Sequence, residues 1–240
     1  MLTMRYFTLK TRLLALLLLA ATCAVAQPTP AELAARPERS ASIYHSYEFL
    51  PGPAAPVPAG YKPFYISHYG RHGSRYHSTE AAYAEPLAAL RKAAEAGKLT
   101  SKGREVLAKV EALAADAEKR YGDLSPRGVQ EHRGIAERMY ATYPEVFSTA
   151  KGRVCRIESR STQVPRCILS MAAFNERLKE LNPAISTTRD ASARDMGYLA
   201  NGPSLKASRK AAGEVADSLT RMRVNPDRLM KSLVTDPSCI

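Results

Sequence analysis

The chain has 240 residues, of which 45% are hydrophobic and 24% are charged, and this balance excludes a wholly disordered protein. The length is enough for one domain with a sizeable hydrophobic core. The formal net charge of +12 favours anionic partners, whether nucleic acid, anionic membrane or a phosphorylated small molecule.

The first 26 residues have the organisation of a secretory signal peptide, with a basic start, an apolar run at residues 13–21 and small residues before Gln27. The apolar stretch is shorter than the roughly 20 residues of a membrane-spanning helix, so we expect cleavage and no stable membrane insertion. A lipoprotein anchored at Cys23 is the alternative, which the larger Thr22 before it disfavours. We therefore expect an exported protein, periplasmic or extracellular, and export argues against a nucleic-acid partner.

The next elements are predicted from prolines and periodicity. Residues 27–62 are expected to form a proline-rich entry segment before the core. Within it, residues 51–63 are expected to be extended, because their five prolines exclude helix and central strand. FYISHY, residues 64–69, alternates in the manner of a buried strand before the turn at Gly70. Helices are predicted over residues 79–96 and 102–121.

A further helix is predicted from the sequence LSPRG, with Ser125 as its cap, Pro126 in its first turn and Pro144 at its end. After it come a short strand at residues 153–159, a helix from Ser161 and a possible third strand at AISTTRD. Two more helical stretches follow, over residues 203–223 and from Pro226. This order predicts an α/β sheet with flanking helices, with a core at residues 63–190 and the start of a helical cap at 191–240.

Three cysteines follow the signal sequence: Cys155, Cys167 and Cys239. An odd number in an oxidising compartment leaves a disulfide open as an alternative. Their spacing is not that of a metal site. We interpret them as small apolar residues, which cysteine side chains usually are when they are buried.

The sequence RHGSR, residues 71–75, carries the strongest chemical signal. An imidazole attacks phosphorus only when the charge of the phosphate is neutralised and a ring nitrogen is unprotonated. Guanidinium groups hold phosphate oxygens in two-point contacts and keep their charge at all pH values of interest. A second basic group, Arg160, lies at the start of the predicted helix from Ser161, where free backbone N–H groups favour an anion.

These residues resemble a known family. RHGSRY is similar to the Arg-His-Gly-x-Arg signature of the histidine acid phosphatases, branch two of the histidine phosphatase superfamily. SHYGRHGSRYH, LSPRGVQEHRGIAERMYATYPEVF and ESRSTQVPRCILSMAAF look like bacterial multiple inositol polyphosphate phosphatases, which act on phytate. The resemblance implies that His72 is the nucleophile that becomes phosphohistidine, and that Arg71, Arg75 and Arg160 hold the transferring phosphate. The implied partner is an inositol polyphosphate, with no cofactor and no metal.

Members of this family also carry His-Asp or His-Ala-Glu nearer the carboxyl end, whose acid protonates the leaving oxygen. None of the five histidines here is followed by Asp or by Ala-Glu. We therefore expect the chain to be the amino-terminal portion of such an enzyme, with impaired activity toward phytate. The alternative is a catalytically inactive fragment that binds phosphate.

Other polar residues have plainer interpretations. A metal site from His68, His72 and His77 is disfavoured, because their spacing across a strand and a turn does not converge and no carboxylate joins them. His132 is interpreted as a solvated or interhelical residue. Asp190 and Asp195 are expected to brace loops. The basic residues of the cap are interpreted as a solvated helix face, with contact to a polyanion as the alternative; they are Lys206, Arg209, Lys210, Arg221 and Arg223.

Overall fold

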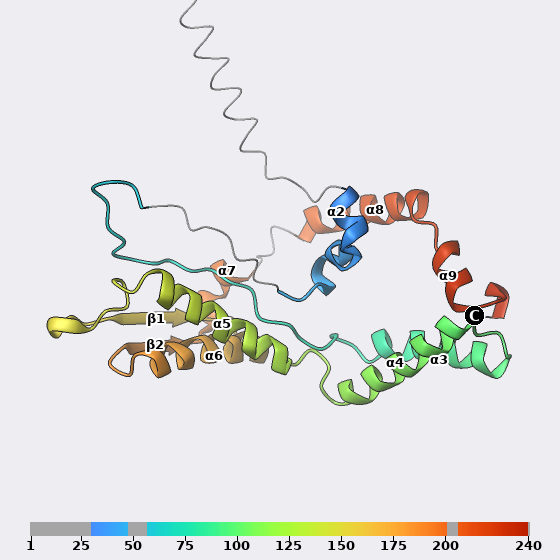
Figure 1. The fold of residues 1–240 in the computed structure, drawn as a ribbon, viewed down its shortest axis with the longest axis horizontal. Helices are drawn as coiled ribbons and strands as arrows, with labels where there is room; N and C mark the ends of the chain where they lie inside the picture. The colour runs from blue at the N-terminus through green and yellow to red at the C-terminus, as the bar shows by residue number, and fades with distance from the viewer. Residues whose placement is uncertain (1–29, 48–56, 201–205, 240) are drawn as a thin grey trace, which may run out of the picture. The chain divides into compact units, whose positions relative to one another are not determined.

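The computed structural model describes residues 30–47, 57–200 and 206–239 (Figure 1). The predicted signal peptide lies outside these ranges and stays a prediction, as do the prolines within residues 51–56. The described elements are α2 (Pro30–Ala35), η1 (Pro37–Tyr44), α3 (Ala81–Glu95), α4 (Ser101–Ala117), α5 (Pro126–Thr142), η2 (Ala150–Gly152), β1 (Arg156–Arg160), α6 (Pro165–Leu181), β2 (Ser186–Asp190), η3 (Ala193–Asp195), α7 (Met196–Leu199), α8 (Lys206–Arg223), α9 (Asp227–Leu233) and η5 (Pro237–Cys239), where η marks a 3-10 helix.

The chain divides into two compact units, residues 1–48 and 49–240. The described part of the first unit contains only the short helices α2 and η1, which the sequence reading did not predict. An exposed ion pair of 2.8 Å joins Arg36 Nε to Glu38 Oε1 between them. Exposed pairs of this kind contribute little to stability.

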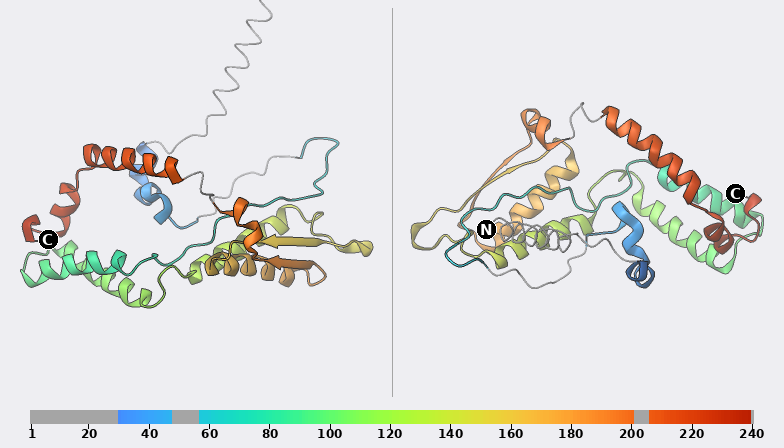
Figure 2. Two further views of the ribbon diagram at one scale, coloured as in Figure 1. Left: turned by 180° about the vertical axis from the view of Figure 1, so that it is seen from behind. Right: turned by 90° about the horizontal axis from the view of Figure 1, so that it is seen from above.

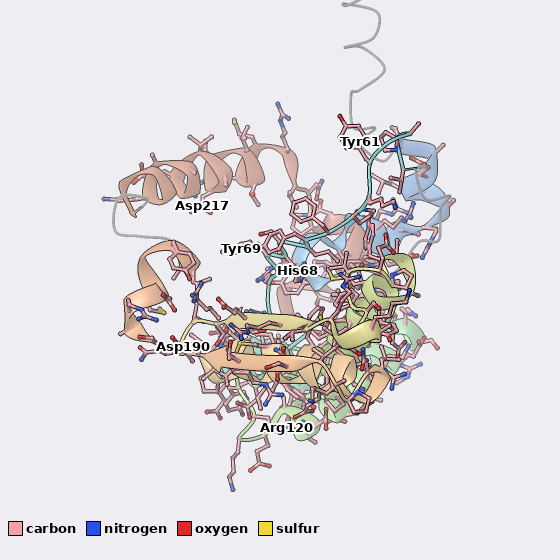
Figure 3. All side chains as sticks on the ribbon, turned by 90° about the vertical axis from the view of Figure 1, so that its left-hand side faces the viewer. Tyr61, His68, Tyr69, Arg120, Asp190 and Asp217 are labelled. Atoms are coloured by element: carbon pink, nitrogen blue, oxygen red, sulfur yellow. The ribbon has the colours of Figure 1, made fainter. Side chains whose placement is uncertain are left out.

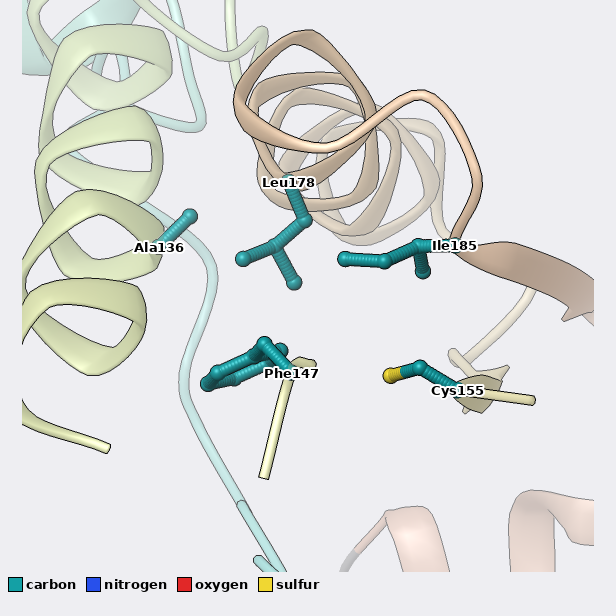
Figure 4. Packing of buried hydrophobic residues seen from close by; sticks show 5 residues of the cluster. All are labelled: Ala136, Phe147, Cys155, Leu178 and Ile185. Atoms are coloured by element: carbon teal, nitrogen blue, oxygen red, sulfur yellow. The ribbon is translucent and has the colours of Figure 1, made fainter. Parts of the chain in front are cut away.

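The second unit contains a small parallel sheet with flanking helices, which confirms the predicted mixed α/β class. β1 pairs with β2 from Arg156 opposite Ser186 to Arg160 opposite Asp190, and α6 is the crossover between them. α5 packs beside α6 next to this sheet (Figure 2). The buried side chains between them are Ala136, Phe147, Cys155, Leu178 and Ile185 (Figure 4).

Helices α3, α4 and α9 enclose a second cluster of buried side chains, formed by Leu90, Ala93, Leu99 and Val234. Thr100 caps α4 by accepting a hydrogen bond from the backbone N–H of Gly103 at 2.9 Å. Leu99 and Val234 form an antiparallel bridge that ties α9 to the start of α4. In the part of the chain that the structure describes, no helix is both long enough and apolar enough to cross a membrane.

Several predicted elements are confirmed with small shifts. α3 and α4 cover the two predicted helices, and α5 begins at Pro126 with Ser125 Oγ accepting from Gly128 N at 3.2 Å. β1, β2, α8 and α9 occur where strands and helices were expected. Cys155 is buried in the core and, like Cys167 and Cys239, is a free thiol.

The predicted strand at residues 64–69 is wrong: this segment is extended but has no ladder partner among the described residues. The alternation does not sort the side chains into two faces: Ile66 packs against the core, but Phe64 is exposed, as are Tyr65 and Tyr69. His68 stacks on Phe174 of α6 with ring centroids 5.6 Å apart; Figure 3 shows His68 and Tyr69. Alternation predicts two faces, but a strand also needs a neighbouring backbone to satisfy its N–H and C=O groups.

The start of α6 also differs from the prediction. The helix begins at Pro165 and not at Ser161, and Val164 before it has ψ of 124°. A residue before proline is sterically excluded from the helical region, whereas proline itself fits the first helical position. The consequence is that Arg166, and not Arg160, lies in the first turn of α6.

Candidate active site

The loop that carries His72 is tied to the segment before α5 by backbone hydrogen bonds. Arg75 and Leu124 form an antiparallel bridge. The N–H of Tyr76 donates to the carbonyl of Asp123 at 3.0 Å, and the N–H of Ser125 donates to the carbonyl of Ser74 at 2.9 Å. The loop therefore has a fixed backbone although it contains no regular secondary structure.

Gly73 and Gly128 allow this loop to lie directly on α5. A Cβ atom added to Gly73 would overlap the carbonyl oxygen of Gly128 and lie 2.6 Å from its Cα. A Cβ on Gly128 would overlap the carbonyl oxygen of Ser74. The glycine after His72 is thus needed for packing against a helix.

Polar side chains of α5 and α6 hold the same loop. Ser170 Oγ accepts a hydrogen bond from the N–H of Gly73 at 3.1 Å. Glu131 accepts two hydrogen bonds of 2.7 Å each, from the N–H and the hydroxyl of Ser74. His132 Nε2 lies 3.1 Å from the carbonyl oxygen of Arg71. Of the two expected surroundings of His132, solvated or interhelical, the solvated one is wrong, because its side chain is buried and its partner is the backbone of Arg71.

His72 itself is half-buried, and its ring has a defined orientation. Nδ1 lies 2.8 Å from the carbonyl oxygen of Gly73. Since a carbonyl oxygen only accepts, the neutral ring carries its proton on Nδ1 and has a lone pair on Nε2. Burial lowers the pKa of His72 below 6.5, and the positive charges of Arg166, Arg71 and Arg75 lower it further. The lowered pKa therefore favours the neutral form of the ring near pH 7.

Arg166 is the arginine with the largest electrostatic effect on His72, ahead of Arg71 and Arg75. Its position one turn before Ser170 on α6 explains this, since Ser170 bonds the loop at Gly73. The sequence analysis missed Arg166 because it placed the start of this helix at Ser161. Pro165, the usual residue at a first helical position, was the signal that would have placed Arg166 beside the site.

Two of these arginines have buried nitrogens that find no hydrogen-bond partner within the described residues. They are Nε of Arg75 and Nε of Arg166; the hydroxyl of Thr162 is in the same condition. Arg75 otherwise donates to the carbonyl of Tyr76 at 2.7 Å, and Arg166 donates to the carbonyl of Gly122 at 3.3 Å. Buried donors are normally satisfied, so these atoms suit an anionic acceptor.

Arg160 has different partners. Its Nε lies 3.6 Å from Asp195 Oδ2, and its Nη2 lies 3.9 Å from Glu158 Oε2. Tyr198 raises the pKa of Arg160 most, by its charge and its hydrogen bond, and Asp195 adds to this effect. Half of the Arg160 side chain is exposed. The role of Arg160 in holding the transferring phosphate stays a prediction.

The other polar residues singled out in the sequence are His77, Asp190 and the basic residues of α8. His77 makes an edge-to-face contact with Tyr83 at 6.1 Å. Within the described ranges, no group of His, Cys, Asp and Glu side chains is arranged to hold a metal ion. Asp190 accepts a hydrogen bond from Arg194 at 3.1 Å, which agrees with the expected bracing of a loop. In α8, the side chains of Lys206 and Arg209 lie outside the described set; the exposed ones are Lys210, Arg221 and Arg223.

The three histidines at this site predict that the protein loses stability as the pH falls below neutrality. Burial lowers the pKa of His68, His72 and His132 below 6.5, so the unfolded chain binds more protons than the folded chain below that pH. The free energy of unfolding is therefore highest above pH 6.5 and falls as the pH drops through the lowered pKa values. We expect a lower midpoint of urea unfolding at pH 5.5 than at pH 7.5, measured without phosphate.

Carboxylates do not explain a loss of stability between pH 7.5 and pH 5.5, because they titrate at lower pH. The ordinary pKa of Glu180, for example, is 4.5, and its pKa in the folded protein is about 2. Their contribution disappears only at more acidic pH. His132→Gln removes one of the three titrating groups and reduces the difference between the two midpoints. Equal midpoints at both pH values for the unmodified protein contradict the prediction.

Comparison with solved structures identifies crystal structures of the multiple inositol polyphosphate phosphatase of Bifidobacterium longum. Its complex with phosphate has a TM-score of 0.51 at 22% identity, over 76% of this chain and 44% of that chain. Its complex with inositol hexasulfate gives a TM-score of 0.42 at 28% identity, over 56% of this chain and 28% of that one. The apo form gives 0.43 at 29% identity, over 55% and 26%.

The chain therefore spans less than half the length of these structures. No protein-family model and no curated protein sequence matches it. The likeness to the phosphate complex shows that the chain has the fold of part of a phosphatase.

Proposed function

We propose that the protein is a phosphomonoester hydrolase that acts on inositol polyphosphates through a phosphohistidine at His72. One observation carries this proposal. His72 presents an unprotonated Nε2 beside Arg71, Arg75 and Arg166, and none of these arginines pairs with a carboxylate within the described residues. By contrast, Arg133 and Arg177, away from the loop, are both paired with Glu180.

The chemistry follows from this arrangement. The lone pair of His72 Nε2 attacks phosphorus as the ester P–O bond breaks, and the alcohol oxygen leaves with that electron pair and takes up a proton from solvent water. Water then attacks phosphorus, the N–P bond breaks, and orthophosphate and neutral His72 are released. The guanidinium groups neutralise charge on the equatorial oxygens in both steps. Arg71, Arg75 and one of Arg160 and Arg166 hold the transferring phosphate.

The substrate class rests on the motifs RHGSRY and ESRSTQVPRCILSMAAF, which resemble those of inositol polyphosphate phosphatases, and agrees with the fold likeness. The formal net charge is +12, and +9 after loss of Arg5, Lys10 and Arg12 with the expected signal peptide (12 − 3), and a basic protein attracts a polyanion of this kind.

A second candidate function is phosphate binding without turnover. It is favoured by the state of Glu131, the carboxylate bound to the loop. This side chain is buried and accepts two hydrogen bonds from Ser74, so it is not available to protonate a leaving oxygen. Among the described residues, no carboxyl group forms a hydrogen bond or an ion pair with His72.

The two functions are separated by labelling. The protein is mixed with ³²P-labelled p-nitrophenyl phosphate, whose leaving group needs little protonation, and quenched in base. We expect base-stable, acid-labile label on His72, and a loss of at least about 1,000-fold in His72→Asn, because the nucleophile is absent. His77→Asn, which changes a nearby histidine of the same loop, is the matched control and keeps the label.

Calorimetry with inositol hexakisphosphate and an assay of released phosphate accompany the labelling. Binding without label or release selects the second function. If the protein neither binds inositol hexakisphosphate nor becomes labelled, both functions are excluded.

A further inference from the structure

Two adjacent residues of α5, Glu131 and His132, contact the backbone on either side of His72. His132 reaches the carbonyl of Arg71, the residue before the nucleophile, at 3.1 Å. Glu131 reaches the N–H and hydroxyl of Ser74, two residues after it, at 2.7 Å each. Both side chains are buried, with exposed fractions of 8% for Glu131 and 7% for His132.

The helix geometry explains how two neighbours reach two points of one loop. Successive residues of an α-helix point about 100° apart, so Glu131 and His132 diverge around the loop. Gly128 precedes them by three and four positions and lies on the same face, where it contacts Gly73 directly. One face of α5 therefore contacts the loop from Arg71 to Ser74 with His72 between the two polar contacts.

These contacts fix the backbone from which the His72 ring projects. The carbonyl oxygen of Arg71 accepts, so the neutral His132 ring donates from Nε2. On the other side, the carboxylate of Glu131 receives two donors from a single residue, which fixes both the amide plane and the side chain of Ser74. The Gly73 carbonyl, which orients the His72 ring through Nδ1, lies in the peptide group whose N–H belongs to Ser74.

We propose that Glu131 and His132 are positioning residues that hold the nucleophile loop so that Nε2 of His72 faces the phosphate site. This inference rests on the proposed function. The proposed role does not involve the reacting atoms, since His132 bonds the backbone of Arg71 and Glu131 bonds the N–H and hydroxyl of Ser74. Errors of about 1 Å in the position of a reacting group cost up to about 100-fold in rate, so this support affects chemistry more than binding.

The test compares variants that keep or remove the donor at position 132. His132→Phe fills the space without a donor, whereas His132→Gln places an amide N–H near the position of Nε2. We expect His132→Phe to slow single-turnover phosphorylation of His72 by about 30- to 100-fold, and His132→Gln to stay within about threefold of the unmodified protein. The dissociation constant for orthophosphate changes less than threefold in both. Gln130→Ala, at the exposed neighbouring position of α5, is the matched control and changes neither quantity.

The same comparison applies to position 131. Glu131→Gln keeps one oxygen that accepts from the Ser74 N–H, and Glu131→Leu removes both acceptors at similar volume. We expect Glu131→Leu to lose at least 10-fold more phosphorylation rate than Glu131→Gln. If both variants lose rate equally, the hydrogen bonds to Ser74 do not position the loop.

A second readout does not depend on turnover. The ¹⁵N resonances of the His72 ring report which nitrogen carries the proton. We expect the Nδ1–H form in the unmodified protein and in His132→Gln, and a mixture of both forms in His132→Phe. If His132→Phe fails to fold, His132→Asn, whose amide is too short to reach the carbonyl, takes its place.

The outcomes separate the two proposals. Absence of phosphohistidine in the unmodified protein, with the tautomer change in His132→Phe present, overturns the proposed function and leaves the positioning role. Phosphohistidine at an unchanged rate in His132→Phe, with an unchanged tautomer, overturns the positioning role and leaves the function.

Discussion

Replacing Arg166 by glutamine lowers the rate of His72 phosphorylation by about 100- to 1,000-fold, the usual loss when one preorganised donor to a developing anion is removed. Arg166 has the largest electrostatic effect on His72 among the arginines, and its buried Nε finds no hydrogen-bond partner within the described residues. In the proposed function this guanidinium holds the phosphate, while its Nη1 donates to the carbonyl of Gly122. The measurement is single-turnover labelling with ³²P-labelled p-nitrophenyl phosphate.

Arg166→Lys keeps the charge but loses the planar fork, and we expect it to recover only part of the lost rate. Arg160→Gln is the matched comparison, because it removes the same group from the residue that the sequence predicts. The Arg160 side chain is half exposed and lies beside Asp195 and Glu158, so we expect a loss of less than about 10-fold with this small substrate. If Arg160→Gln lowers the phosphorylation rate more than Arg166→Gln does, then Arg160, and not Arg166, holds the phosphate together with Arg71 and Arg75.

The helices around the site were predictable because their signals are local. Ser125 and Pro126 predict the start of α5, and the structure has Ser125 as its cap. The periodicity of residues 102–121 likewise predicts α4. Such signals depend on residues within one or two turns, so tertiary contacts do not alter them.

The misread elements depend on distant partners. Residues 64–69 alternate as a strand does, but pairing is a property of two segments, and none of the described segments pairs with this one. His132 looks like a surface residue from its charged neighbours, yet its partner is the carbonyl of Arg71, 61 positions away. A hydrogen bond to a backbone carbonyl leaves no trace in residue type, so the support of the nucleophile loop is not visible in the sequence.

Of the candidate site, the motif at residues 71–75 was identified from residue types alone, because phosphate chemistry needs a particular set of groups. The contribution of α6 was not. The sequence predicts an anion site at the start of this helix, at Arg160. The helix begins four residues later, so Arg166 lies in its first turn, and the role of Arg160 stays a prediction. An error of four residues in a helix boundary thus changes which arginine lies in the first turn of the helix.

Gly73→Ala is expected to destabilise the protein by about 3 kcal/mol or more, because the added methyl group meets backbone and not a movable side chain. The new Cβ would overlap the carbonyl oxygen of Gly128 and lie 2.6 Å from its Cα. Relief requires the loop to move away from α5, which also breaks the contacts of Glu131 and His132. We therefore expect a lower midpoint of urea unfolding together with a loss of His72 phosphorylation.

Two glycines of α5 provide the control, because the same substitution has opposite expected signs on one helix. Gly128→Ala places a Cβ against the carbonyl oxygen of Ser74 and 2.7 Å from Leu124 Cδ1, so it destabilises in the same way as Gly73→Ala. At Gly134 the nearest atom is Nη1 of Arg138 at 3.0 Å, the far end of a flexible side chain. There alanine adds helix propensity worth up to about 1 kcal/mol, and the midpoint stays or rises. If Gly73→Ala and Gly128→Ala unfold at the same urea concentration as Gly134→Ala, the loop does not lie on α5 in solution, and the contacts that orient His72 lose their basis.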